Sequence, residues 1–253
     1  MEKKFNPTLS VITVVYNNVK HIERTLKSVI NQTYSDIEFI VIDGASTDGT
    51  LNIIEKYRSD IDILISEPDK GIYDAMNKGL KIASGEYVIF MNSGDEFYGN
   101  TTVEQVFKTS AFADIYYGET EMLDENLMNQ GRRRHKAPQQ LQLKSFQFGM
   151  SVSHQAIIIK KSIVKNYDSK YQLSADIDWI LDAITKAQKI VNTQLVIAKY
   201  LMGGMSKKRH LQSLKERYQI FKNYYGFLPN LFNHVVIAKN LLWFYLKNRK
   251  TND

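Results

Sequence analysis

The sequence predicts an α/β fold in which a mostly parallel, Rossmann-like sheet is covered by helices on both faces. Two observations support this prediction. Short apolar runs rich in β-branched residues alternate, over the first hundred residues, with segments whose apolar residues recur at helical spacing. The connections between these segments are short, which is typical of strand–helix–strand units that build a parallel sheet.

The first elements follow this alternation closely. Continuous apolar runs predict buried strands over residues 9–15 and 37–42, and a third strand over 61–65. Apolar residues at helical spacing predict a helix from residue 22 to about residue 32, and a second helix that begins at Leu51.

A third predicted helix, residues 72–83, leads into the stretch on which the site depends. Residues 87–91 form another buried strand pattern, and the chain then becomes polar within one residue, at Asn92-Ser93-Gly94-Asp95. Small hydrogen-bonding groups, a glycine and a carboxylate thus follow the carboxyl end of a strand, which is where open α/β sheets bind ligands.

The second half of the chain has weaker patterns. Strands are predicted over residues 114–118 and 155–159, and the segment 189–202 indicates one or two more. Between them a helix is expected to begin after Ser174. Its first turn would hold two carboxylates, Asp176 and Asp178, which project in different directions, so that one can face the cleft and the other solvent.

The last 47 residues differ in charge from the rest. From residue 207 onward ten Lys or Arg accompany two acidic residues, a net charge of +8, whereas residues 1–206 carry 23 positive and 25 negative side chains, a net charge of −2. The pattern indicates two basic amphipathic helices, separated by a break at 226–230, with Leu211, Leu214 and Phe221 in the apolar stripe of the first. The weakly acidic body argues against a general nucleic-acid binder.

Composition and motifs exclude several kinds of chemistry. The chain has no cysteine, which excludes disulfides, cysteine-ligated metal centres and thiol nucleophiles. The glycine motifs of dinucleotide enzymes and P-loop NTPases are absent. Residues 1–7 lead into strand pattern without the apolar stretch of a signal peptide, so we expect no export.

Polar loops follow three of the predicted strands. They carry Tyr16-Asn17, Asp43 with Ser46 and Asp48, and the segment 92–95. Because parallel strands end at the same edge of a sheet, these loops are expected to form a crevice for a polar ligand of nucleotide size. A diphosphate beside carboxylates requires a divalent cation, and oxygen ligands suit Mg²⁺ or Mn²⁺.

Four collinear segments carry a family resemblance. Residues 10–17, 41–50, 77–87 and 90–95 together resemble the nucleotide-sugar-binding half of family 2 glycosyltransferases, which have the GT-A fold. Residues 66–79 are similar to a bacterial subgroup that assembles exopolysaccharide, capsule and O-antigen.

The resemblance implies a domain organisation. A GT-A catalytic domain would span residues 1–206, with a nucleotide-sugar-binding half over 1–98 and an acceptor-side half over 99–206. Residues 207–253 would form a C-terminal helical appendage.

The resemblance also implies a donor pocket. Thr13, Val15 and Tyr16 would line the pocket for the base, and Asp43 would accept a hydrogen bond from the base imide. The alternative for Asp43 is an Asx-turn in a glycine-rich loop, and for Asp48 we favour a capping role before the helix.

Further donor contacts are implied on both sides of this pocket. Asp69 and Lys70 would close over the nucleoside. The remaining implied donor contacts are Ser46, Asn92, Ser93 and Gly94.

Asp95 matches the carboxylate that holds Mn²⁺ or Mg²⁺ against the donor diphosphate. Many family members have two more carboxylates in this turn, where the present chain has Asn92 and Gly94. A metal ion would then be bound by Asp95, the diphosphate and water, so strict metal dependence is an open question.

Asp176 is the expected general base. Family members carry an acidic pair at the start of a helix in this region, and Ala175-Asp176 takes its place. In an inverting transfer this carboxylate would remove the proton from the acceptor hydroxyl as the hydroxyl attacks the anomeric carbon. The alternative is a helix-terminal residue that interacts only with the helix dipole.

Other polar residues have two interpretations. His154 would contact the acceptor or be a partly buried structural side chain. Ser206 and Arg209 would fold over the leaving diphosphate or belong to a linker. The basic stretch 131–136 would be a mobile solvated loop or would contact a phosphate-bearing acceptor.

Together these observations predict an inverting transferase. It would move a sugar from a nucleotide-diphosphate donor to a glycan or polyprenyl-lipid-linked acceptor. We expect the donor to be a UDP-sugar. It would work in the cytoplasm at the inner face of the membrane. Residues 207–253 would contact this membrane. The two helices could instead pack on the body, or on a second subunit of a homo-oligomer. The alternatives are a sugar-nucleotide-binding or membrane scaffold module without turnover, and a nucleotidyltransferase.

Overall fold

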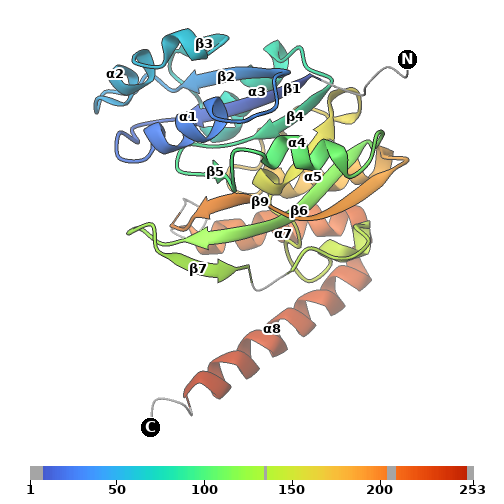
Figure 1. Ribbon diagram of the computed structural model, residues 1–253. Helices are drawn as coiled ribbons and strands as arrows, with labels where there is room; N and C mark the ends of the chain where they lie inside the picture. The colour runs from blue at the N-terminus through green and yellow to red at the C-terminus, as the bar shows by residue number, and fades with distance from the viewer. Residues whose placement is uncertain (1–7, 134–135, 204–208, 250–253) are drawn as a thin grey trace.

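The computed structural model describes residues 8–133, 136–203 and 209–249. Their strands belong to one mixed sheet with helices on both faces (Figure 1). The strands are β1 (Leu9–Val15), β2 (Ile37–Asp43), β3 (Ile63–Ser66), β4 (Tyr87–Phe90), β5 (Glu96–Phe97), β6 (Ile115–Leu123), β7 (Asn129–Arg132), β8 (Ile157–Lys160) and β9 (Ile190–Leu201). The helices are α1 (Ile22–Ile30), α2 (Thr50–Glu55), α3 (Ile72–Ile82), α4 (Thr102–Lys108), α5 (Ala175–Lys186), α7 (His210–Tyr225) and α8 (Phe227–Arg249).

The first half of the sheet has the predicted parallel arrangement. The strand order is β3-β2-β1-β4-β8-β6-β9-β5, with β7 paired to β6. β1 is parallel to both β2 and β4, and β2 is parallel to β3. Beyond β4 the sheet is mixed, because β8 is antiparallel to both β4 and β6, whereas β6 and β9 are parallel. The predicted α/β fold class is confirmed.

Both faces of β1 are buried, which explains its continuous apolar run. Ile12 and Val14 pack in one core, beneath α3 and α5, whereas Leu9 and Val11 pack in the other, beneath α1 and α4. Helix α3 approaches β1 closely, since a Cβ atom on Gly79 would lie 2.5 Å from Ile12 Cγ2. This close packing fixes the position of α3 relative to the sheet. It therefore also fixes the first turn of α3, which lies beside the site.

Several element boundaries differ from the prediction. β3 begins at residue 63 rather than 61, because a 3-10 turn occupies 58–60. β8 begins at 157 rather than 155, because residues 154–156 form another 3-10 turn (η3). The segment 190–201 is a single strand.

Long-range pairing explains two further differences. β6 extends to Leu123 instead of ending at residue 118, because β9 pairs with it along its whole length, with two register shifts. Part of the predicted mobile basic stretch is a strand, since Gly131 and Arg132 belong to β7 and pair with β6. Residues 124–127 form the turn between β6 and β7, whereas β9 lies far from β6 in the sequence, so local patterns do not predict its pairing.

The C-terminal segment forms two helices, as predicted. The break is confined to Gly226, at φ +83, and Pro229 lies in the first turn of α8, where a missing N–H is tolerated. Leu211 and Leu214, which belong to the predicted apolar stripe, are exposed. The predicted domain boundary at 206/207 lies outside the described residues.

Helix α7 packs on α5 through a partly polar face. Glu216 is buried and accepts hydrogen bonds from the backbone N–H groups of Gln172 and Leu173, at 3.1 and 2.8 Å. Ile220 and Phe221 are buried beside it. Helix α8 then projects away from the body (Figure 1). Within the described ranges, no helix has the length and apolar character needed to span a bilayer.

Candidate active site

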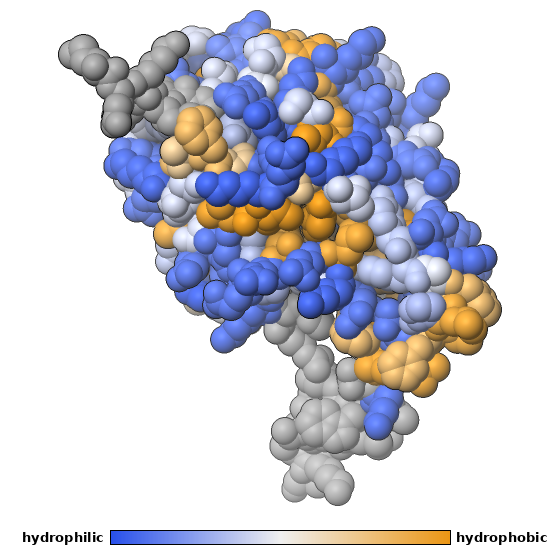
Figure 2. Space-filling view, turned by 90° about the vertical axis from the view of Figure 1, so that its right-hand side faces the viewer, coloured by the Kyte–Doolittle hydropathy of each residue, from blue (hydrophilic) through white to orange (hydrophobic). Residues whose placement is uncertain are grey.

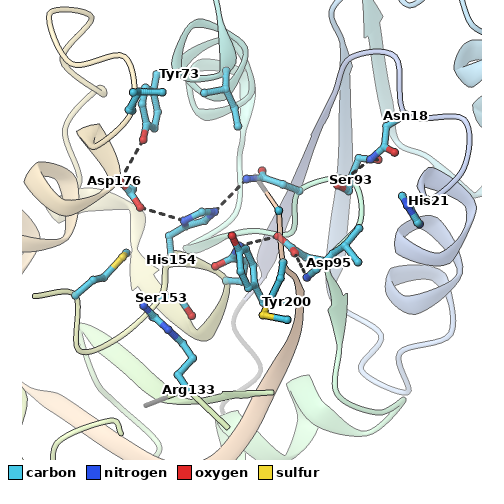
Figure 3. Close-up of a pocket in the computed structure, with 18 of the residues that line it drawn as sticks. Asn18, His21, Tyr73, Ser93, Asp95, Arg133, Ser153, His154, Asp176 and Tyr200 are labelled. Carbon is cyan, nitrogen blue, oxygen red and sulfur yellow. Dashed lines mark hydrogen bonds and ion pairs between the residues drawn. The ribbon is translucent and has the colours of Figure 1, made fainter. Parts of the chain in front are cut away.

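A cavity of about 750 Å³ opens beyond the carboxyl ends of β1 and β4. Its wall includes residues from the loop after β1, the turn after β4, the start of α3, the η3 turn, the start of α5 and helix α7. Asp95 and Asp176 both line it (Figure 3). Segments from both halves of the chain therefore meet at one site.

The turn after β4 is fastened to the loop after β1 and to α1. Asn18 Nδ2 donates to Ser93 Oγ at 2.9 Å. Thr25 Oγ1 accepts from the Gly94 N–H at 2.9 Å and donates to the Asp95 carbonyl oxygen at 2.7 Å. Gly94 has φ +104, which favours glycine at this position. These bonds fix the direction in which the Asp95 side chain leaves the turn.

Asp95 is buried, with both carboxylate oxygens hydrogen-bonded. Oδ2 accepts from Gln155 Nε2 at 2.7 Å, and Oδ1 accepts from the Leu201 N–H at 3.1 Å. Burial raises the pKa of Asp95 from 3.8 to about 6, and the bond from Gln155 and the charges of His154 and Arg24 offset only part of this effect. A neutral amide and a backbone N–H are weak compensation for a buried charge.

Asp176 lies in the first turn of α5 and has different neighbours. Tyr73 Oη donates to Oδ1 at 3.1 Å, and His154 Nδ1 lies 3.5 Å from Oδ2. Burial acts to raise the pKa of Asp176, but His154, the charge of Arg217 and the Tyr73 hydroxyl outweigh it, and the pKa falls below its ordinary value. Burial holds the pKa of Tyr73 well above its ordinary value, so this phenol remains a donor.

His154 connects the two halves of the site. Its Nε2 lies 3.0 Å from Asn92 Nδ2. With the amide nitrogen as donor, Nε2 accepts, and the ring hydrogen is on Nδ1, facing Asp176. Asn92 Oδ1 is buried without a hydrogen-bond partner among the described residues. A residue from the turn after β4 thus sets the orientation of the group that contacts Asp176.

The oxygen groups near Asp95 fit a hard cation that is held partly by its ligand. Asp95 supplies one carboxylate, and Asn92 Oδ1 is an unpartnered oxygen in the same wall. The described residues contain no group of three or more His, Asp or Glu side chains that could hold a metal ion by themselves. Mg²⁺ and Mn²⁺ commonly take remaining ligands from phosphates and water.

The residues predicted for the base pocket lie at the same sheet edge, outside the lining of this cavity. Asp43 Oδ2 accepts from Ser66 Oγ at 2.6 Å and from the Ser46 N–H at 3.1 Å, which is the turn geometry of the structural alternative. A Cβ on Gly44 would meet Asp69 Oδ2 at 2.9 Å and Tyr16 Cδ2 at 3.3 Å, so the Tyr16 ring and Asp69 flank the same glycine.

The other predicted donor contacts have defined positions. Thr13 is buried and donates to the Met91 carbonyl at 2.8 Å, and Val15 is buried at the end of β1. Ser46 Oγ accepts from the Asn17 N–H, and Lys70 is exposed. Their roles toward a donor stay predictions.

Asp69 is engaged in an ion pair. Its Oδ1 lies 2.6 Å from Lys78 Nζ.

Asp48 accepts from the N–H groups of Thr50 and Val19 and lies one residue before Gly49, the N-cap residue of α2. The favoured capping interpretation of Asp48 therefore needs only a shift by one position.

Asp178 does not face solvent, contrary to the prediction. It is buried, with Oδ2 2.8 Å from Lys165 Nζ and Oδ1 accepting from Tyr224 Oη at 3.2 Å. Arg209 is exposed and donates to Gln172 Oε1 at 3.3 Å. Ser206 lies outside the described residues.

Sequence reasoning missed several residues of the cavity. Tyr73 and Gln155 contact the two carboxylates, and Arg217 lines the wall. Arg133, which also lines it, belongs to the basic stretch 131–136 already singled out from the sequence. The polar pair His154-Gln155 directly before an apolar strand was a usable signal for Gln155. Arg217, on α7, had none.

Comparisons with known proteins agree with this geometry. The Glycosyl transferase family 2 model matches residues 10–167. An uncharacterised glycosyltransferase of Mycobacterium tuberculosis is 32% identical over 213 residues, which covers 80% of this chain and 78% of that protein. The UDP-Glc:alpha-D-GlcNAc-diphosphoundecaprenol beta-1,3-glucosyltransferase WfaP of Escherichia coli is 27% identical over 218 residues, covering 82% and 83%.

Solved structures share the fold. A Staphylococcus aureus TarS structure in complex with UDP-GlcNAc has a TM-score of 0.64 at 20% identity and covers 92% of this chain and 71% of that one. The chain spans 42% of a longer TarS structure. A Pyrobaculum calidifontis mannosyltransferase in complex with GDP-Man and Mn²⁺ has a TM-score of 0.63 at 17% identity, covering 86% of this chain and 64% of that one.

Proposed function

The chain belongs to glycosyl transferase family 2, and from this premise we propose that it is an inverting, UDP-sugar-dependent glycosyltransferase of bacterial surface polysaccharide synthesis. Its acceptor would be a hydroxyl of a glycan or a lipid-linked sugar. One observation carries the proposal: Asp95 and Asp176 share a cavity, and their pKa values are shifted in opposite directions. Such pairs divide chemical roles between two carboxylates.

Asp176 is the proposed general base. Its lowered pKa keeps it ionised at neutral pH, so it can accept the proton of the acceptor hydroxyl. Tyr73 donates to one carboxylate oxygen and His154 lies against the other, so the side chain is oriented before the acceptor arrives. Attack by that hydroxyl on the side opposite the leaving diphosphate inverts the anomeric centre.

Asp95 and the Asn92 side-chain oxygen would hold Mn²⁺ or Mg²⁺. The cation would offset the charge of the donor diphosphate. The names of two similar proteins, TarS with UDP-GlcNAc and the UDP-Glc-dependent WfaP, support a uridine donor; they do not distinguish hexosyl from N-acetylhexosaminyl transfer.

We further propose that the appendage contacts the inner leaflet. An α7–α8 apolar patch is exposed, and apolar side chains gather on this end of the molecule (Figure 2). The patch consists of Leu211, Leu214, Phe227, Leu228, Leu231, Phe232 and Val235. Exposed Lys215, Lys222 and Lys239 accompany it, which is the composition that anionic lipid surfaces attract.

Donor turnover tests the catalytic proposal. Purified protein is incubated with UDP-glucose, UDP-N-acetylglucosamine and their congeners with Mn²⁺, and UDP release is compared with that of Asp176→Asn. Release that the substitution abolishes supports the enzyme. Donor binding without release in either protein would support a scaffold instead, and release of inorganic diphosphate from UTP and a sugar 1-phosphate would identify a nucleotidyltransferase.

Vesicle sedimentation tests the membrane contact. Leu228→Ser/Phe232→Ser is expected to lose binding to phosphatidylglycerol-rich vesicles, whereas Met128→Ser, which alters an exposed apolar residue far from the appendage in sequence, is expected to retain it. If neither protein binds vesicles and light scattering shows a dimer that only the double substitution dissociates, the patch is a subunit interface.

A further inference from the structure

Two arginines in the cavity wall are not used by the proposed mechanism. Arg133 directly follows β7, and Arg217 lies on α7. Both line the cavity that contains Asp176. Segments far apart in the sequence thus bring two guanidinium groups to the same wall.

The structure gives these groups no counterpart. Arg133 Nη1 and Arg217 Nε are buried and have no hydrogen-bond partner among the described residues. No ion pair within 4.0 Å joins either guanidinium to a described acidic residue. Buried donors normally have partners, and a buried cation without one is costly. This arrangement is typical of a site whose ligand supplies the acceptor atoms.

The local charge balance points to an anion. Burial and the neighbouring charge of Arg217 lower the pKa of Arg133, whereas Tyr200, Asp176 and Glu119 act in the opposite direction. A guanidinium nevertheless stays charged at any physiological pH. Glu119 Oε1 already accepts from the Ala137 N–H. Of the carboxylates in the cavity lining, Asp95, Glu125 and Asp176, it is Asp176 that acts on Arg133.

We propose that Arg133 and Arg217 form an oxyanion subsite that holds a phosphate group of the acceptor. This inference rests on the proposed function, because it assigns a chemical class to the acceptor of that transfer. Guanidinium groups bind phosphate oxygens through paired N–H donors, which gives both affinity and orientation. A sugar linked through phosphate to a lipid would place its hydroxyl at Asp176 and its phosphate on the arginines.

The subsite belongs to the acceptor rather than to the donor for two reasons. Arg217 is among the charges that act on Asp176, whereas those that act on Asp95 come from His154 and Arg24. In Figure 3, Arg133 lies on the side of Ser153, away from Asn18, Ser93 and His21. An attack opposite the leaving group places the donor diphosphate and the base on opposite sides of the anomeric carbon, so cations beside the base meet the acceptor.

Two acceptors that differ only in phosphate test the inference. One is a hexosamine 1-diphosphate esterified with an alkyl chain, and the other is the same hexosamine and chain joined without phosphate. For Arg133→Gln and Arg217→Gln, the KM of the diphosphate acceptor should rise about tenfold to hundredfold, as expected for a lost charge-assisted bond. The KM of the UDP-sugar should not change.

Arg132→Gln is the matched control. It removes the same charge one residue earlier, from an exposed side chain that does not line the cavity. It should leave the KM of both acceptors unchanged. Two results would overturn the acceptor assignment. One is an equal rise in KM for the diphosphate and the phosphate-free acceptor, and the other is a raised KM for the UDP-sugar in Arg133→Gln or Arg217→Gln.

A binding experiment separates this inference from the proposed function. Should the wild-type protein release no UDP and transfer no sugar, the proposed function fails, and calorimetry with the diphosphate probe on UDP-loaded protein judges the subsite alone. Binding to wild type and to Arg132→Gln, weakened in both cavity variants, supports it. Equal binding by all four proteins refutes it.

Folding is controlled in the same series. No described acceptor loses a bond when either guanidinium is removed, so the melting temperature of Arg133→Gln should not fall. Arg217→Gln also loses a charge that favours the anionic form of Asp176, so any fall in melting temperature should be confined to this variant. Arg217→Lys keeps the charge without the planar fork and should give an intermediate KM. A KM as high as that of Arg217→Gln would show that geometry rather than charge dominates, and a wild-type KM would contradict phosphate recognition by the fork.

Discussion

Asp95 and Asp176 face the same cavity, but their surroundings differ. Asp95 has neutral hydrogen-bond donors, Gln155 and the Leu201 N–H, and burial dominates its pKa. Asp176 has His154, Tyr73 and Arg217 around it, and these outweigh burial. The comparison shows that the type of neighbour, rather than depth alone, decides which carboxylate is stable as an anion.

The contrast also distinguishes stability from function. An anionic Asp95 destabilises the folded protein above its pKa, whereas an anionic Asp176 stabilises it. A buried anionic carboxylate that destabilises the fold is stabilised when a cation binds beside it, so such a residue is a candidate for metal binding. Four experiments test this difference between the two carboxylates.

The largest effect is expected for Asp176→Asn. The substitution removes the proton acceptor, so the rate of sugar transfer should fall by about 10² to 10⁴. Donor affinity should stay unchanged, because the proposed role of Asp176 is toward the acceptor. The measurement is kcat for transfer together with UDP-sugar affinity by calorimetry. A variant that retains most of its activity would remove the distinction between the two carboxylates.

The second effect concerns stability and has opposite signs at the two sites. The pKa of Asp95 is about 6 in the folded state and 3.8 in the unfolded state. Its charge therefore does not lower the free energy of unfolding below pH 3.8. Between pH 3.8 and 6 the loss of stability grows, and above pH 6 it is constant. Asp95→Asn should therefore stabilise the metal-free protein at pH 7 by about 3 kcal/mol, and this gain should vanish near pH 4.

Asp176→Asn is the matched comparison for that experiment. The lowered folded-state pKa of Asp176 gives stability that is complete above its unfolded pKa and is lost as the pH falls through the folded value. This variant should melt below wild type at pH 7. Thermal unfolding from pH 4 to 8 measures both differences, and shifts of the same sign would contradict the contrast.

A smaller effect is expected for His154→Ala. His154 lies 3.5 Å from Asp176 Oδ2 and helps to lower its pKa. Its loss should reduce kcat about tenfold and move the acidic limb of the pH–rate profile to higher pH. If kcat falls while the limb stays in place, His154 contacts the acceptor instead of orienting the base.

The smallest effect is expected for Tyr73→Phe. The hydroxyl makes one hydrogen bond, to Asp176 Oδ1, so its removal should lower kcat about three- to tenfold and shift the acidic limb upward slightly. Tyr167→Phe is the control, because that buried hydroxyl has no hydrogen-bond partner among the described residues. Equal losses in the two variants would indicate a packing effect.

The helical appendage illustrates how far pattern alone could be trusted. Its two helices were predictable from apolar spacing, but the buried face was not. Glu216 is buried because the free N–H groups of Gln172 and Leu173 need an acceptor, and Leu211 is 75% exposed. The hydrogen bonds to Gln172 and Leu173 thus orient α7, and this orientation leaves Leu211 exposed.

The parallel first half of the sheet and the turn that carries Asp95 could be predicted from the sequence. Those features depend on local patterns, namely runs buried on both faces and a polar turn at a strand end. It also placed Asp176 at the start of a helix, where the charged form is favoured.

The residues that surround the two carboxylates are known from the folded structure alone. Gln155 reaches Asp95, while Tyr73, His154 and Arg217 surround Asp176, and these four residues come from three elements, η3, α3 and α7. A pKa depends on burial and on the nearest donors and charges, and these distances are set by strand order and helix packing between segments far apart in the chain.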